Sequence, residues 1–181
     1  SHVVILPFTR MLSGPMEYTP GVLDVEIKQG YPGRRVHGTT TQQLAMYVTF
    51  YSPIQMLADL PENYSVPAYQ FLKDVPTDWA DTKVLNAEIG EYLTTVRKDQ
   101  NSEDWYLGSM TNEKARDLEI KLSFLDAKAT YEAQIYADAE GTDETHNPTA
   151  VAISKKTVKA SDVLKLHLGG AGGTAIRFKK L

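Results

Sequence analysis

The chain has 181 residues and a mass of 20.2 kDa, enough for one ordinary domain or for one small domain plus part of another. Hydrophobic residues make up 42% and charged residues 23%, close to the globular average, which excludes an intrinsically disordered chain. The net charge of −4 argues against nucleic-acid binding, and the absence of Cys excludes disulfides and Cys-ligated zinc.

The first half of the chain begins with an apolar segment and a loop. Val3 to Phe8 is a continuous apolar run, which predicts a strand covered on both faces. Thr9 to Gly21 contains two Gly and two Pro, so it is expected to be a loop. The opening residues lack the basic region of a signal peptide, and no apolar run approaches the roughly 20 residues of a membrane span. The abrupt start on a strand suggests a chain cut from something longer.

Three helices are predicted between Thr39 and Pro76. The first is capped by Thr39, Thr40 or Thr41, and its apolar residues recur at helical spacing at Leu44, Tyr47, Val48 and Tyr51. The second starts with Ser52 as N-cap and Pro53 at the first position, with Ile54, Leu57 and Ala58 on its buried face. The third lies around Pro67 to Lys73, with Tyr69, Phe71 and Leu72 turned inward. A strand, a long loop and helices form the order of a βα unit.

The second half, from about Thr77, alternates with a period of two and predicts an all-β domain. Turn residues separate the short apolar runs at the spacing of a sandwich or barrel. The expected strands lie at 84–89, 92–97, 105–109, 118–124, 130–137, 150–154, 163–168 and 174–178.

Several motifs in the second half have an ordinary structural interpretation. The run from Gly169 to Gly173 lacks the Lys-Ser/Thr of a phosphate loop and is predicted to be a flexible hairpin tip. The acidic residues between Asp138 and Glu144 lack the pattern of a calcium loop and are predicted to be solvated. The aromatic residues could stack on sugars, but burial in a core is the favoured interpretation; they are Trp79, Trp105, Tyr131 and Tyr136.

The loop from Arg10 to Gly21 carries most of the functional information. It follows the apolar run at what would be its C-terminal end, where a (β/α)₈ barrel holds its active-site loops. It also contains Arg10, Glu17 and Tyr18. Chemistry alone leaves an active-site loop and an ordinary connection equally favoured.

The residues of this region resemble a known family. Leu6 to Gly21 is similar to the last barrel strand and loop of glycoside hydrolase family 97, which comprises bacterial α-glucosidases and α-galactosidases. Glu17 departs from the pattern, which more often has Asp there. The resemblance continues along the whole chain and thins in the β half; its matching segments are 43–45, 51–56, 58–64, 71–79, 82–85, 105–108 and 111–116.

The resemblance implies an α+β fold of two parts. Residues 1–76 would be the remnant of a (β/α)₈ barrel, one strand plus helices, and residues 77–181 an all-β antiparallel sandwich that serves packing or oligomerisation. It places the catalytic carboxylates and the family's Ca²⁺ ligands upstream of this chain. No catalytic or metal residue is therefore assigned here. The expected substrate-binding residues are Arg10, Met16, Glu17 and Tyr18. Members of the family are periplasmic or secreted.

Two functions follow as hypotheses. In the first, the chain is the C-terminal part of a glycosidase that acts on α-glucosidic or α-galactosidic bonds in oligosaccharides. Because hydrolysis needs two carboxyl groups, roughly 5–9.5 Å apart, the chain alone is predicted to be inactive. The remainder of the barrel, or another copy in a homo-oligomer, would then cover Val3–Phe8. In the second, the chain is a stand-alone β-sandwich module that binds carbohydrate or protein. Neither hypothesis involves nucleic acid or a membrane.

Overall fold

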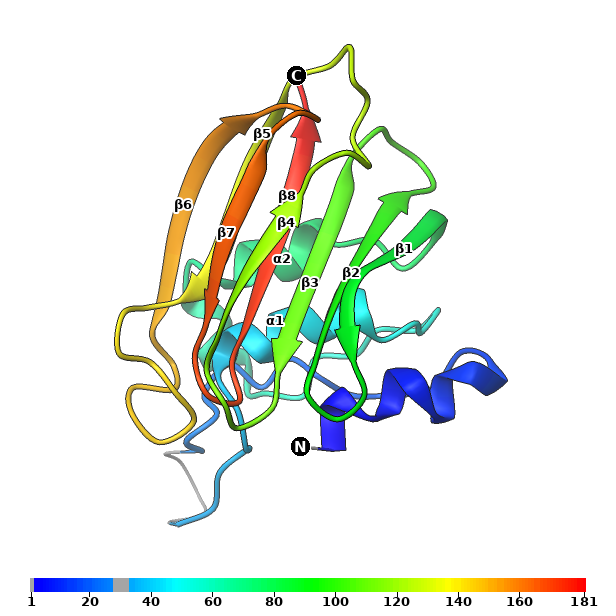
Figure 1. The fold of residues 1–181 in the computed structure, drawn as a ribbon. Coiled ribbons are helices and arrows are strands. Elements are labelled where there is room, and N and C mark those ends of the chain that lie inside the picture. Colours follow the sequence, from blue (N-terminus) through cyan, green and yellow to red (C-terminus); the bar gives the residue numbers. More distant parts are fainter. Residues whose placement is uncertain (1, 28–32) are drawn as a thin grey trace.

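The computed structural model describes residues 2–27 and 33–181, and its dominant feature is a pair of antiparallel sheets (Figure 1). The larger sheet has the strand order β1-β2-β3-β8-β5-β6, and β4 pairs with β7 in a second, two-stranded sheet. The strands are β1 Trp79–Glu88, β2 Tyr92–Asp99, β3 Trp105–Thr111, β4 Arg116–Lys121, β5 Tyr131–Asp138, β6 Val151–Val158, β7 Val163–Leu168 and β8 Gly173–Lys180.

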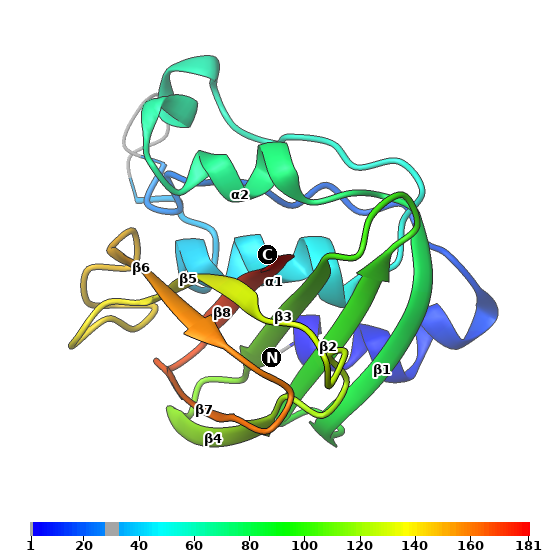
Figure 2. The same ribbon diagram turned by 90° about the horizontal axis from the view of Figure 1, so that it is seen from above.

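The larger sheet is covered on both faces, as Figure 2 shows from above. On one face it packs against β4 and β7, and a core that includes Val96, Leu107, Ile120 and Ile176 fills the space between the sheets. On the other face lies α1 (Thr40–Thr49), with α2 (Tyr69–Asp74) beyond it. The antiparallel sandwich is thus confirmed.

All ten residues of α1 are buried, although five of them are polar. The Thr39 side chain caps the helix by accepting a hydrogen bond from the Gln42 amide, at 3.2 Å. Other polar side chains of α1 reach backbone groups of neighbouring segments, as in the Thr40 hydroxyl bond to the Leu23 carbonyl. The helix is therefore enclosed between the sheet and the α2 layer rather than amphipathic. Among the described residues, no helix is long and apolar enough to cross a membrane.

The strand expected at Val3–Phe8 is wrong. The segment forms short 3₁₀ turns instead, η1 (His2–Val4) and η2 (Leu6–Phe8), followed by η3 (Arg10–Ser13). A strand needs a neighbour to take its backbone hydrogen bonds, and no described strand pairs with this segment. The backbone bonds locally, with the Phe8 amide donating to the Ile5 carbonyl at 3.0 Å. The apolar run still anchors the chain, because Val4 is buried against Ala45 and Met46 of α1.

The helix expected after Ser52 is also wrong. The Ser52 hydroxyl donates a hydrogen bond to the Ile54 carbonyl at 2.6 Å instead of capping a helix. The Tyr47 hydroxyl donates another to the Met56 carbonyl at 2.7 Å. A single turn of helix is stable only when its apolar face is covered. Ile54 and Leu57 are exposed in this structure, so that cover is missing among the described residues. Helical structure resumes at η4 (Pro61–Ser65) and α2.

The eight predicted strands are confirmed, with boundaries moved by up to five residues. The largest change is at β1, which begins at Trp79 rather than Val84. Parallel pairing is absent among the described strands, so the barrel remnant of the expected fold stays a prediction. The division of the chain at residue 76 into two domains also stays a prediction.

The glycine-rich segment is not the flexible hairpin tip predicted for it. It connects β7 of the small sheet to β8 of the large sheet and is buried throughout. Glycine is required here by close packing, because a Cβ added at Gly169 would overlap the Thr142 carbonyl oxygen, and one at Gly173 would meet the backbone of Gln42. The one residue of the segment with positive φ is Ala171, at 52°.

Candidate functional site

The four predicted substrate-binding residues lie along one loop but do not converge on one pocket. Arg10 is exposed in η3, and its Nη2 donates to the Pro15 carbonyl at 3.4 Å. Met16 is buried, and its amide donates to the Tyr51 carbonyl at 3.1 Å. Glu17 is exposed. Met16 and Glu17 line one hollow of about 260 Å³, together with Pro53 and Ile54.

Tyr18 faces the protein interior. Its ring meets Phe50, at the end of α1, edge to face with centroids 4.8 Å apart, and burial raises the pKa of its hydroxyl. Tyr18 therefore packs the loop against α1, while Arg10 and Glu17 remain available at the surface. The role of these four residues in substrate binding stays a prediction.

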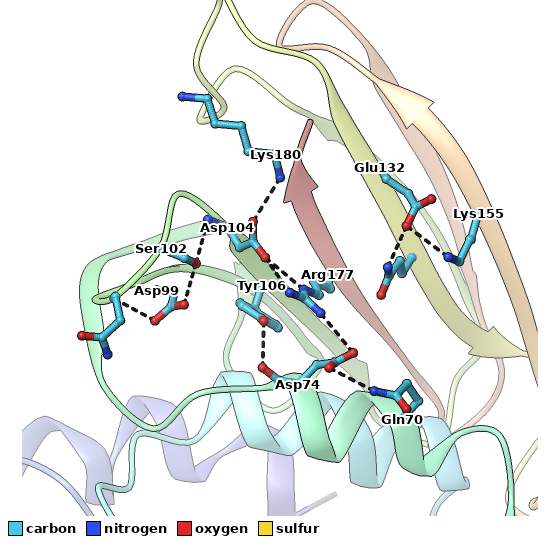
Figure 3. Close-up of polar contacts among 12 residues, drawn as sticks. Gln70, Asp74, Asp99, Ser102, Asp104, Tyr106, Glu132, Lys155, Arg177 and Lys180 are labelled. Carbon is cyan, nitrogen blue, oxygen red and sulfur yellow. Dashed lines mark hydrogen bonds and ion pairs between the residues drawn. The ribbon is translucent and has the colours of Figure 1, made fainter.

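Two carboxylates approach one another around Arg177, but this arrangement is built to hold structure together (Figure 3). Asp74, at the end of α2, lies 3.1 Å from the guanidinium, and Asp104 accepts two hydrogen bonds from it at 2.9 and 3.0 Å. Asp104 also accepts the Lys180 amide, at 3.0 Å. Both carboxylates are thus occupied by the same cation, whereas a glycosidase needs one acid that can give up a proton and one free carboxylate.

Asp138, at the end of β5, is a second buried acid, only 8% exposed. One of its oxygens accepts the amides of Gly169 and Gly173, at 2.9 and 3.0 Å, and the other accepts the Thr41 hydroxyl. Burial raises the pKa of this carboxyl, although the hydrogen bonds act in the opposite direction. With both oxygens engaged inside the protein, Asp138 joins α1 to the glycine-rich segment and is not placed to act on a substrate.

The acidic stretch between Asp138 and Glu144 does not gather into a metal site. Asp138 is turned into the interior, and Asp143 accepts hydrogen bonds from Thr145 and His146 that hold its pKa well below its usual range. Within residues 2–27 and 33–181, no group of three His, Cys, Asp or Glu side chains could hold a metal ion. The expectation that the family's Ca²⁺ ligands lie outside this chain stays a prediction.

The aromatic residues considered as sugar platforms belong to the protein core. Trp105 and Tyr131 are buried between the sheets, and Tyr136 is buried beneath α2. Trp79 is half-buried and packs edge to face on Tyr106, with centroids 5.7 Å apart. This arrangement removes the main support for a stand-alone carbohydrate-binding module, because none of these rings forms an exposed flat platform.

The sequence interpretation missed one site, a hollow of about 730 Å³ beside the end of α1. Its walls come from the N-terminal turns, from Tyr51, and from β1 and β2, and Arg97 lies among them. The sequence offered one signal for this hollow, which is Arg97 itself. Leu93, Thr95 and Arg97 share one face of β2, and the other face of that strand is buried.

Comparison with known proteins places this geometry in a family. Residues 78–179 match the family model described as "Glycosyl-hydrolase 97 C-terminal, oligomerisation". The chain is 36% identical to a retaining alpha-galactosidase of Bacteroides thetaiotaomicron, over 97% of this chain and 27% of that protein.

Solved structures agree with the family model. A glycoside hydrolase family 97 enzyme from Pseudoalteromonas sp. strain K8, solved in complexes with panose and with acarbose, is 46% identical with a TM-score of 0.94. The match covers 99% of this chain and 28% of that one. A beta-arabinopyranosidase with a TM-score of 0.80 and 24% identity shares the fold. The chain thus spans little more than a quarter of the length of these relatives.

Proposed function

The chain belongs to glycoside hydrolase family 97, and on that premise we propose that it forms the C-terminal part of a longer glycosidase. One observation carries the proposal: the model of the family's C-terminal domain matches residues 78–179, in a chain that spans 28% of a solved family enzyme. The whole enzyme would hydrolyse α-glycosidic bonds in oligosaccharides.

Two sugars are candidates for the bond that is cleaved. The relatives named as retaining alpha-galactosidases favour an α-galactosidic bond, and the neighbour solved with panose and acarbose favours an α-glucosidic one. In either case the catalytic carboxylates would come from outside residues 1–181, since the carboxylates around Arg177 and the carboxylate of Asp138 are engaged in the fold.

Within the whole enzyme, we assign the two halves of this chain different tasks. The loop with Arg10, Met16, Glu17 and Tyr18 would form part of the wall of the sugar pocket. The β sandwich would pack on the catalytic part or on another subunit, in keeping with the oligomerisation role that the family model names.

Activity assays on two proteins test the proposal. The 181-residue chain and the full-length enzyme that contains it are each incubated with p-nitrophenyl α-galactoside and p-nitrophenyl α-glucoside. The full-length enzyme is expected to release nitrophenol from one of them, and the 181-residue chain from neither. Turnover by the short chain, or a full-length protein inactive on both α-glycosides, would contradict the proposal.

The 181-residue chain also provides a test of where calcium binds. We place calcium ligands outside this chain, so chelation with EDTA should leave the thermal unfolding of the 181-residue chain unchanged. A lower unfolding temperature of the short chain in EDTA, restored by Ca²⁺, would contradict this placement.

A further inference from the structure

The 730 Å³ hollow has an apolar rim that faces outward. Three large apolar side chains at its edge are exposed: Leu12 at 79%, Ile89 at 68% and Val84 at 59%. They come from η3, β1 and the turn after it, so the rim is assembled from segments distant in sequence. Apolar side chains that gather around one concave site, rather than being scattered singly, are typical of a protein interface.

The wall of the hollow contains a buried cation. Arg97 is only 8% exposed, and its Nε donates to the Val48 carbonyl, one of the last in α1, at 2.6 Å. Its Nη1 donates to the Thr82 hydroxyl at 2.9 Å. The guanidinium also lies over the ring of Tyr51, 5.4 Å from its centroid. Burial lowers the pKa of Arg97 to about 10, which is the mark of a charge held away from water.

Two hydrogen-bond donors at this wall lack acceptors among the described residues, and only the second of them is fully buried. The Nη2 group of Arg97 has no hydrogen-bond partner among the described residues. The indole N–H of Trp79, which also lines the hollow, is buried and unpaired within the described part of the chain. A fully buried donor such as the Trp79 indole N–H is normally satisfied, and a largely buried guanidinium is normally paired with an acid. The residues lining the hollow include neither Asp nor Glu.

We propose that the hollow receives a carboxylate side chain, flanked by apolar residues, from the part of the enzyme outside residues 1–181. The carboxylate binds Nη2 of Arg97, and its apolar neighbours cover Leu12, Val84 and Ile89. This inference rests on the proposed function, since it requires the longer glycosidase. Its occupant is a protein segment rather than a small acid, because a small ligand inside the hollow would leave the apolar rim exposed.

A second copy of this chain fits the hollow less well. A twofold contact between copies brings the same surface patch of each together. Because the described residues that line the hollow include neither Asp nor Glu, the same hollow on a second copy would bring no carboxylate to Arg97. The charge of the site therefore favours a different segment, and the relatives supply one, because this chain covers only 27–28% of their length.

Photo-crosslinking in the full-length enzyme tests where the occupant comes from. Benzoylphenylalanine replaces Ile89 at the rim and, as a control, Ile153 on β6, an exposed apolar residue outside this hollow. Irradiation at the Ile89 position is expected to capture a peptide of the same polypeptide, outside residues 1–181, that contains Asp or Glu. Capture of a second copy, of a peptide without an acid, or of nothing above the Ile153 control would overturn the proposal.

The charge itself is tested in the same assay. Arg97→Gln is expected to reduce the Ile89 crosslink severalfold, whereas Lys121→Gln, which removes an exposed charge from β4, leaves the yield unchanged. If Arg97→Gln fails to fold, neutralising the acid of the captured peptide makes the same test with Arg97 in place. An unchanged yield would overturn the proposal. Because the readout is a crosslink, it stands or fails separately from glycosidase activity.

Discussion

At the scale of single residues, Gly169 after β7 and Gly141 after β5 show how one amino acid can serve two different needs. Gly169 is required because the Thr142 carbonyl occupies the space where a side chain would begin. Gly141 has open space around it but a φ of 72°, which side chains disfavour. Sequence alone assigned glycine in the β7–β8 segment to turn geometry, because close approach of a distant backbone leaves no local signal.

Replacing these two glycines separates the two causes. Gly169→Ala should destabilise the fold by about 3 kcal/mol or more, since backbone must move to admit the methyl group. Gly141→Ala should cost about 1 kcal/mol, the usual penalty for a left-handed conformation. Urea unfolding of both variants measures the difference. Equal losses would show that space is not what selects glycine at position 169.

The buried carboxyl of Asp138 makes stability depend on pH. Burial raises the pKa of this carboxyl in the folded chain above the ordinary 3.8. Between the ordinary pKa and the raised pKa, the folded chain therefore binds the proton more tightly than the unfolded chain does. The stabilisation from Asp138 is therefore complete below the ordinary pKa and is lost as the pH rises through the raised one. The slope contributed by this one group is at most about 1.4 kcal/mol per pH unit.

Asp138→Asn should remove this component of the pH dependence. Its carbonyl oxygen can still accept the amides of Gly169 and Gly173, and its amide can donate to the Thr41 oxygen, so the fold should survive. Unfolding free energies measured from pH 4 to pH 7 compare the variant with the wild type. Parallel curves for the two proteins would mean that Asp138 does not titrate in this range.

At the scale of elements, the sequence predicted strands well and isolated segments poorly. Alternating runs such as the one that became β7 carry their own two-faced pattern, and each found a pairing partner. The apolar runs at Val3–Phe8 and Ile54–Leu57 have no such partner among the described residues. Their hydrophobicity alone therefore did not determine their conformation. Arg97 and Asp138 were missed as buried groups for a related reason, since their neighbours come from distant segments.

The Arg177 network connects an element of the helical layer to the sheet. Arg177→Met should destabilise the fold by about 3 kcal/mol, because Asp74 and Asp104 would remain partly buried without their shared cation. Lys165→Met breaks an ion pair with Glu119 on the exposed β4–β7 sheet and should cost less than about 0.5 kcal/mol. Chemical denaturation of the two variants provides the comparison. Similar losses would place the Arg177 network among ordinary surface ion pairs.

At the scale of the whole molecule, the chain forms stacked layers, with α1 enclosed between the large sheet and α2. The loop with Met16 and the 730 Å³ hollow both lie next to the residues that follow α1, since Tyr51 contacts both regions. Contacts made by the rest of a glycosidase would therefore reach the helical layer and the sheet together. The proposed contacts would cover the apolar residues that are exposed around residues 51–60 and around the rim of the hollow.

The strand order has a consequence for how the protein is made. β8, the last of the described strands, lies in the larger sheet between β3 and β5, and no other described strand joins β1-β2-β3 to β5-β6. During translation the first seven strands leave the ribosome before β8 does. The pairing of β3 and β5 with β8, which completes the larger sheet, can form only after β8 has been synthesised. Because such long-range pairing is slow, the nascent chain passes through a period with unpaired strand edges. The position of β8 thus makes the edges of β3 and β5 the parts of the larger sheet that stay open longest during synthesis.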